Sequence, residues 1–302
     1  MKTSLGFTKS LYILAFDHRS SFSRDLLGIK NKPGLTQVAK IKELKQVIFA
    51  GFRSAVKQEG VPASEAAVLV DEQYGEAVLR QAKKANYQIC LSAEKSGKGV
   101  FTLEYGNQFA EHIEKFKPLF VKTLVRYNPE DDKNKNQQKL SQVSELGNWC
   151  HQHNYKLLVE LLVPATAEQL SSVSGSKDRY DLELRPSLTQ QAVAWFQQAG
   201  IQADVWKIEG MDKTEDYQLV MDQIKLGGKE VKAVVLGRGE DSKHMERWLK
   251  AAKPVDGIIG FAIGRTIFLQ ALQDFLTSKI TEQQVIEQIS ERYTYFYKVF
   301  NS

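Results

Sequence analysis

The feature that most constrains the fold of this sequence is an alternation, repeated eight times, of a short apolar run and an amphipathic segment. Most of the runs are apolar at both odd and even positions, which is typical of parallel strands covered on both faces. The predicted strands are residues 11–16, 67–71, 88–92, 119–124, 156–163, 204–209, 231–236 and 257–261.

The segments between the strands have apolar residues at helical spacing and recognisable ends. The helix over 35–59 stops at Gly60, and the last helix, over 281–300, begins with a capping box at Thr281 and Gln284. We expect the apolar stripe on the last helix to pack on the barrel. The sequence leaves open whether the protein also forms a homo-oligomer. The other predicted helices are 76–85, 107–116, 137–153, 187–199 with Ser187 as N-cap, 214–225, 242–253 and 265–277.

Eight strand–helix units in 302 residues predict a single (β/α)8 TIM barrel domain over residues 1–302, with an extra C-terminal helix. The alternative is a doubly wound open sheet, which needs a glycine-rich turn after its first strand. This chain has Asp17-His18-Arg19-Ser20-Ser21 there instead. The connection 164–186 is long for a βα loop, so we expect it to be disordered or to form a lid.

Composition argues against several classes of partner. The formal net charge is only +5, and the lysines are scattered among acids, so nucleic-acid binding is not expected. No apolar run approaches the roughly 20 residues of a membrane span, and because residues 1–6 lack the apolar segment of a signal peptide we do not expect one. The two cysteines lie on different predicted elements, which favours a reduced, cytoplasmic protein.

Three charged residues interrupt successive apolar strands: Lys122, Glu160 and Lys207. A charge inside a strand is costly unless it is paired, and burial favours the neutral amine that can attack a carbonyl. We therefore predict that Lys207 forms a Schiff base, that Lys122 is a nearby cation favouring the neutral amine, and that Glu160 moves protons. The roles of the two lysines could be exchanged. The structural alternative is an inward layer of salt bridges.

Other polar residues follow the strands at the end where barrel enzymes carry their sites. Asp17 is expected to orient the substrate or the second ammonium group. Two glycine turns, Gly237-Arg238-Gly239 and Gly264-Arg265, follow the last two strands, where barrels frequently bind phosphate. These arginines could equally be solvated. The remaining predicted substrate-binding residues are His18, Arg19, Glu94 and Arg126.

No cofactor and no metal is predicted. The five histidines are spread over different elements, so a histidine metal site is not expected. Two alternatives stay open: a magnesium enzyme in which Asp71, Glu72 and Glu94 cluster, and a phosphosugar-binding barrel without catalysis.

Six motifs occur in order along nearly the whole predicted barrel: Ala15-Phe16-Asp17-His18-Arg19, Asp71-Glu72-Gln73-Tyr74-Gly75, Glu94-Lys95-Ser96-Gly97, Val121-Lys122, Val159-Glu160 and Trp206-Lys207-Ile208-Glu209. Together they resemble the class I tagatose-1,6-bisphosphate aldolase family. The resemblance implies that Lys207 forms the Schiff base with a ketose phosphate and that Glu160 is the acid/base. It also implies that Lys122 and Asp17 assist.

A narrower resemblance rests on Leu11-Tyr12-Ile13-Leu14-Ala15-Phe16-Asp17-His18-Arg19 and Leu236-Gly237-Arg238-Gly239-Glu240-Asp241. These two sequence segments resemble the aldolase-like domain that is joined to the sugar kinase of bacterial inositol breakdown. This implies cleavage of 2-deoxy-5-keto-gluconate 6-phosphate to dihydroxyacetone phosphate and malonate semialdehyde. His18 and the turn at Arg238 depart from the tagatose pattern, so that sugar specificity is not carried over. Arg238 is expected to meet a carboxylate or a second phosphate.

Overall fold

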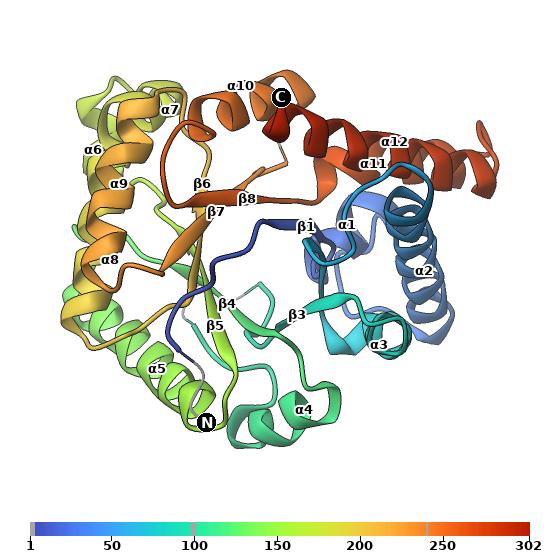
Figure 1. Cartoon of the computed structure of the whole chain (residues 1–302), viewed down its shortest axis with the longest axis horizontal. Coiled ribbons are helices and arrows are strands. Elements are labelled where there is room, and N and C mark those ends of the chain that lie inside the picture. The colour runs from blue at the N-terminus through green and yellow to red at the C-terminus, as the bar shows by residue number, and fades with distance from the viewer. Residues whose placement is uncertain (1–3, 98–100, 240) are drawn as a thin grey trace.

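The computed structural model describes residues 4–97, 101–239 and 241–302. Eight parallel strands close into a barrel in sequence order, with β1 (Leu11–Ala15) paired to both β2 (Ala66–Val70) and β8 (Ile258–Ile263). Helices surround the barrel (Figure 1). The predicted (β/α)8 TIM barrel with an additional C-terminal helix is therefore confirmed.

The strands lie within two residues of their predicted bounds at either end. Their near-continuous apolar character follows from burial on both faces, inside the barrel and under the helices. They are β1 Leu11–Ala15, β2 Ala66–Val70, β3 Gln88–Ser92, β4 Phe120–Arg126, β5 Lys156–Leu162, β6 Val205–Glu209, β7 Lys232–Leu236 and β8 Ile258–Ile263.

The helices depart from prediction mainly at their beginnings. Helix α3 starts four residues early because the Asp71 carboxylate caps it, accepting from Tyr74 N at 2.8 Å. Ser187 is not an N-cap, because α8 continues without a break from the turn before it. The helices are α1 Ser20–Leu27, α2 Leu35–Gln58, α3 Glu72–Lys84, η1 Gly106–Gln108, α4 Phe109–Phe116, α5 Lys133–Gln152, α6 Ala167–Ser172, α7 Lys177–Arg179, η2 Tyr180–Leu184, α8 Arg185–Gln198, α9 Thr214–Leu226, α10 Ser242–Ala252, α11 Arg265–Leu276 and α12 Glu282–Asn301.

The long connection after β5 is ordered, so the expectation of disorder is wrong. It contains α6, α7 and the π turn η2. The Tyr180 hydroxyl donates to Val163 O at 2.8 Å, and Asp181 lies 2.7 Å from the Arg238 guanidinium. These contacts fix the connection to the ends of β5 and β7.

Strand parity divides the core into two parts. Val205 belongs to the small cluster inside the barrel, whereas Trp206 packs outward, edge-on to Phe196 of α8 at 5.6 Å. Lys207 follows Val205 on the inner face. At the opposite end of the barrel, the Phe7 ring packs edge-on against Phe120 at 5.1 Å and extends the apolar cluster inside the barrel.

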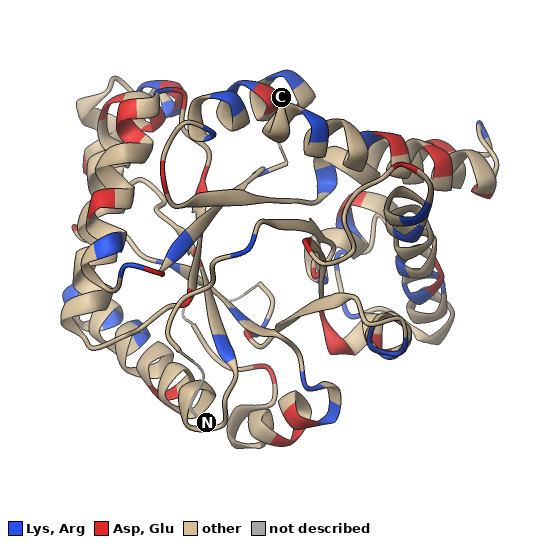
Figure 2. Cartoon of the chain, viewed as in Figure 1, with Lys and Arg blue, Asp and Glu red and all other residues tan. Residues whose placement is uncertain are grey.

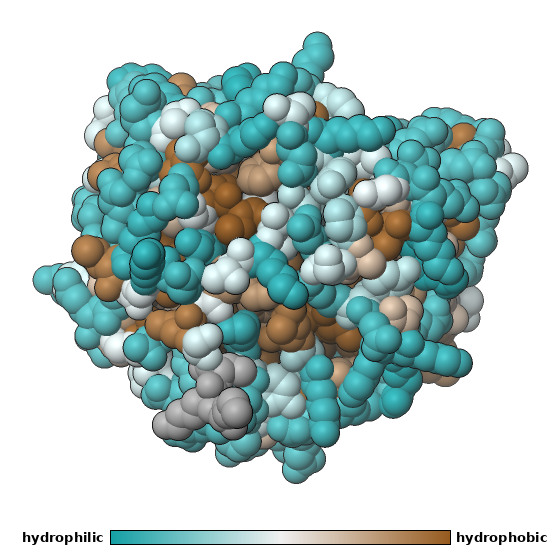
Figure 3. All heavy atoms as spheres, in the orientation of Figure 1, coloured by the Kyte–Doolittle hydropathy of each residue, from teal (hydrophilic) through white to brown (hydrophobic). Residues whose placement is uncertain are grey.

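The last helix packs as expected. Its stripe is buried against α2 and the barrel, the Tyr293 hydroxyl donates to Tyr12 O at 2.6 Å, and the capping box at Thr281 is present. Charges of both signs are spread over the outer helices (Figure 2). The face seen in Figure 3 is mostly hydrophilic, with hydrophobic residues showing between polar ones. None of the described helices is long and apolar enough to cross a membrane.

Candidate active site

Three charged side chains form a layer inside the barrel, on adjacent strands. Lys122, Glu160 and Lys207 project inward from β4, β5 and β6, and Glu160 is the register partner of Lys207. All three are buried, with exposed fractions of 1, 7 and 5%. They lie one layer above the apolar interior formed by residues such as Phe120, Leu158 and Val205. Alternate residues of each strand face the barrel interior, and this alternation on three neighbouring strands brings the three side chains together.

Glu160 bridges the two lysines. Its Oε1 lies 2.8 Å from Lys207 Nζ, and its Oε2 lies 2.8 Å from Lys122 Nζ. Lys122 has two further carboxylates, Asp17 at 2.7 Å and Glu94 at 2.8 Å. Lys122 thus has three acidic partners, whereas Lys207 has one among the described residues.

The pairing fixes the charge states of this layer. Burial alone would lower the pKa of Lys122, but three neighbouring carboxylates raise it well above its ordinary value. Burial would raise the pKa of Glu160, yet Lys122 and Lys207 hold it below its ordinary value. The pKa of Asp17 is likewise lowered by Lys122 against the effect of burial. At neutral pH, Lys122 is an ammonium group and both acids are carboxylates.

The backbone on either side of Asp17 is fixed by a buried lysine that sequence analysis missed. Lys45 of α2 is fully buried and donates to Phe16 O at 2.8 Å and His18 O at 3.1 Å, the carbonyls on either side of Asp17. Its ammonium group also pairs with the Asp71 carboxylate. A signal was present, because Lys45 follows Ile41 by four residues within the apolar stripe of its helix.

His18 and Arg19 line the same wall in different ways. Burial lowers the pKa of His18 to about 4, so the imidazole is neutral at pH 7. Its Nδ1 is buried without a hydrogen-bond partner among the described residues. Arg19 is paired to Glu104 at 2.6 Å and donates to the main-chain oxygen of Glu94. His18 therefore lines the cavity as a neutral, half-buried imidazole, whereas the ion pair of Arg19 supports the wall.

The two glycine turns after β7 and β8 are packed together. Arg265 donates to Arg238 O at 2.9 Å, and its guanidinium lies across Gly239, where a Cβ would be 2.8 Å away. Arg238 has a left-handed φ of 46°, and its guanidinium meets Asp181 at 2.7 Å and Glu209 at 3.3 Å. At Gly264, a Cβ would collide with the carbonyl of Ala15, so only glycine fits. Glu240 of this motif lies outside the described residues.

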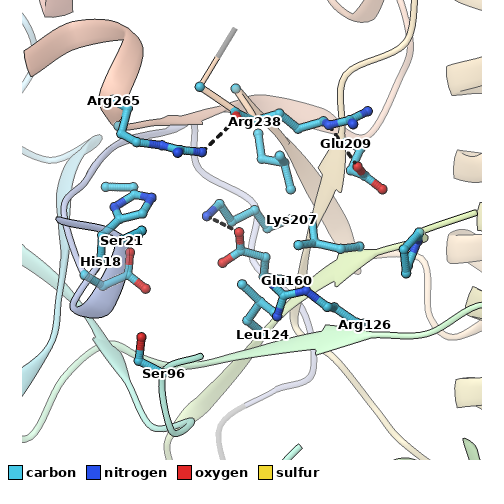
Figure 4. A pocket seen from close by; sticks show the side chains of 18 of the residues that line it. His18, Ser21, Ser96, Leu124, Arg126, Glu160, Lys207, Glu209, Arg238 and Arg265 are labelled. Carbon is cyan, nitrogen blue, oxygen red and sulfur yellow. Dashed lines mark hydrogen bonds and ion pairs between the residues drawn. The ribbon is translucent and has the colours of Figure 1, made fainter. Parts of the chain in front are cut away.

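A cavity of about 710 Å³ opens at the carboxyl ends of the strands. Figure 4 shows Lys207 and Glu160 at its centre, with His18, Arg238 and Arg265 around them. All thirteen predicted site residues line this cavity, including Gly237, Gly264 and Arg126. The connection after β5 adds Lys177, Tyr180 and Asp181, which sequence analysis did not single out, because the folded path of that segment was not predicted.

The carboxylates considered for magnesium do not come together. Asp71 pairs with Lys45, Glu72 with His112 and Lys115, and Glu94 with Lys122. In the part of the chain that the structure describes, no three histidine, cysteine, aspartate or glutamate side chains are grouped to hold a metal ion. Asp71, Glu72 and Glu94 therefore do not form the magnesium site that the sequence left open.

The fold and the cavity define a (β/α)8 barrel protein with a charged pocket at the carboxyl ends of its strands. The chain belongs to the DUF2090 family, described as an uncharacterized protein conserved in bacteria, whose model matches residues 3–302. No curated protein matches the sequence significantly.

Solved structures share the fold at low sequence identity. An archaeal fructose 1,6-bisphosphate aldolase is 15% identical with a TM-score of 0.54, over 94% of both chains. Fructose-bisphosphate aldolase from Slackia heliotrinireducens DSM 20476 is 11% identical with a TM-score of 0.56, over 94% of this chain and 86% of that one. Cgl0159 from Corynebacterium glutamicum is 15% identical with a TM-score of 0.58, over 94% and 85%. These likenesses show the fold.

Proposed function

We propose that this protein is a class I aldolase that cleaves a phosphorylated keto sugar or keto sugar acid. The observation that carries the proposal is the buried Lys122–Glu160–Lys207 layer, in which Glu160 Oε1 lies 2.8 Å from the amine of Lys207. A nucleophilic amine next to a proton carrier, under a cavity, is the arrangement that imine chemistry needs. The fold that the chain shares with solved aldolases supports the same class.

Lys207 is the nucleophile in this proposal. Lys122 is held as an ammonium group by Asp17, Glu94 and Glu160, so its lone pair is not available. Lys207 gives one of its three ammonium protons to Glu160, and the resulting neutral amine attacks the substrate ketone to form a carbinolamine. Glu160 returns that proton to the carbinolamine hydroxyl, which leaves as water, so that an iminium ion forms and Glu160 is again a carboxylate.

Glu160 serves the later proton transfers. It takes the proton from the hydroxyl group on the carbon beyond the breaking bond, and that carbon leaves as an aldehyde. The electron pair of the broken carbon–carbon bond moves onto the iminium nitrogen and forms an enamine. Glu160 returns a proton to the enamine carbon, and water then releases the ketone product from Lys207.

The cavity favours an anionic substrate. Nine lysines and arginines and five aspartates and glutamates line it among the described residues, an excess of four positive charges with His18 neutral. We assign the phosphate to the turns at Gly237-Arg238-Gly239 and Gly264-Arg265. Because of the resemblance of the strand-end motifs, we propose 2-deoxy-5-keto-gluconate 6-phosphate as the substrate. The products would be dihydroxyacetone phosphate and malonate semialdehyde.

The test is cleavage of 2-deoxy-5-keto-gluconate 6-phosphate and of fructose 1,6-bisphosphate, with and without a chelator, followed by enzymatic detection of the triose phosphate. Lys207→Met is the matched inactive variant. Chelator-resistant turnover that is lost in Lys207→Met supports the proposal. Binding of both sugars without turnover would favour a phosphosugar-binding barrel, and loss of activity in chelator would favour a metal enzyme.

A further inference from the structure

One side of the cavity carries cations that no carboxylate of the described residues neutralises. Most of the lining cations are paired, including Arg19, Lys122 and Arg238. Arg126, in contrast, has no ion-pair or hydrogen-bond partner within residues 4–97, 101–239 and 241–302, and its side chain is exposed to the cavity. Lys177 at the start of α7 is exposed in the same way. Unneutralised charge on a cavity wall is a site for an anion.

The strand order gives the position of Arg126 relative to the proposed phosphate site. Arg126 is the last residue of β4, whereas Arg265 lies two residues after the end of β8, the strand diametrically opposite in an eight-stranded barrel. Lys207 lies on β6, between the two. Figure 4 likewise shows Arg126 and Arg265 on opposite sides of Lys207 and Glu160.

The surroundings of Arg126 suit a carboxylate or phosphate ligand. Leu124, Leu162, Pro164 and Leu170 line the cavity on this side. Apolar walls reduce the local dielectric screening and strengthen the attraction of a bound anion. A guanidinium group also presents two parallel N–H donors, which match the two oxygens of a carboxylate or phosphate.

We infer that Arg126, assisted by Lys177, binds a terminal anionic group on the part of the substrate that leaves as the aldehyde. The inference rests on the proposed aldolase function. A substrate with its ketone at Lys207 and its phosphate on the β7–β8 side extends its other end toward β4. Arg126 is then a specificity-determining residue that selects substrates with an anion at both ends.

The test uses the synthetic direction, in which the enamine from dihydroxyacetone phosphate adds to an acceptor aldehyde. The acceptors are malonate semialdehyde, glyceraldehyde 3-phosphate and neutral propionaldehyde. Arg126→Met should lower kcat/KM about 10- to 100-fold for an anionic acceptor and leave that for propionaldehyde unchanged. The acceptor with the larger loss identifies the anion as carboxylate or phosphate. Arg126→Lys should recover part of the loss, and Arg53→Met, on the exposed face of α2, should have no effect.

Borohydride trapping of dihydroxyacetone phosphate on Lys207 separates the two possible failures. If the wild-type protein does not trap the phosphoketone, both the aldolase proposal and this inference are overturned. If trapping is normal in the wild type and in Arg126→Met, but the substitution changes kcat/KM by the same factor for charged and neutral acceptors, or leaves both unchanged, only the role of Arg126 is overturned. Trapping that is intact together with a selective loss of anionic acceptors supports the inference.

Discussion

The amine of Lys207 lies 2.8 Å from Oε1 of Glu160, on the neighbouring strand and in the same layer of the barrel. The second oxygen of Glu160 lies 2.8 Å from Lys122 Nζ. One carboxylate is thus shared between a lysine with three acidic partners and a lysine with one. This asymmetry separates the proposed roles of the two lysines.

Glu160→Gln should form the imine but cleave slowly. The amide keeps the shape of the side chain but cannot accept the substrate proton, and general acid–base catalysis contributes about 10²- to 10⁴-fold. We expect a fall in kcat of that size, measured by triose phosphate release, with borohydride trapping on Lys207 retained. Unchanged turnover would remove Glu160 from its proposed role.

Lys122→Met should destabilise the fold by about 3–5 kcal/mol at pH 7, because it removes the cation shared by three buried carboxylates, of which Glu160 keeps its ion pair with Lys207. The lowered pKa values of Asp17 and Glu160 contribute stability above their unfolded pKa values, and this is lost as pH falls through the folded values. The difference between wild type and variant should therefore shrink below about pH 4. Urea unfolding measures the free energy of unfolding of both proteins, with Lys84→Met on the exposed face of α3 as the control variant. A constant difference down to pH 3 would contradict this account.

His18 should make the fold sensitive to mild acid. Its pKa is lowered by burial from 6.5 to about 4, so the unfolded chain binds the proton more readily between these values. The contribution of neutral His18 to the free energy of unfolding is fully present above pH 6.5 and should fall by about 1–2 kcal/mol by pH 5. His18→Gln should remove this part of the pH dependence in thermal or urea unfolding. An identical pH profile for the variant would show that His18 is not the responsible group.

Lys45→Met should affect both stability and turnover, although Lys45 does not line the cavity. Removing the ammonium leaves Asp71 buried without its cation, at a cost of about 3–5 kcal/mol. It also frees the carbonyls on either side of Asp17, so we expect kcat to fall while the KM for substrate changes little. Lys45→Met combined with Asp71→Asn, which keeps the helix cap, should be less destabilised than the sum of the single variants. Strict additivity would argue against the pairing.

The strands and most helices could be predicted because the barrel imposes simple patterns. A parallel strand buried on both faces is a short apolar run, and β3 was predicted without error. The inward lysines and Glu160 were detectable because a charge within such a run has few structural uses. Helix α1 was missed because it is short, has no side-chain cap, and buries only Phe22 and Ser23.

Other features depend on contacts between segments that are distant in the sequence. Such contacts cannot be predicted from the local pattern of apolar and polar residues. The connection after β5 is rich in serine, yet Tyr180 and Asp181 order it by contacts with Val163 and Arg238. The network of Asp17 and Glu94 around Lys122 likewise depends on how β1, β3 and β4 are arranged in the barrel. The sequence placed these residues at strand ends, but their partners follow from three-dimensional packing.

The most direct test of the central claim is chemical trapping of the proposed imine. The protein is incubated with dihydroxyacetone phosphate, reduced with borohydride, and analysed by intact mass and peptide mapping. The account predicts a single reduced adduct on Lys207, which is absent from Lys207→Met. An adduct on Lys122 instead, or no adduct on folded protein, would contradict the assignment of Lys207 as the nucleophile.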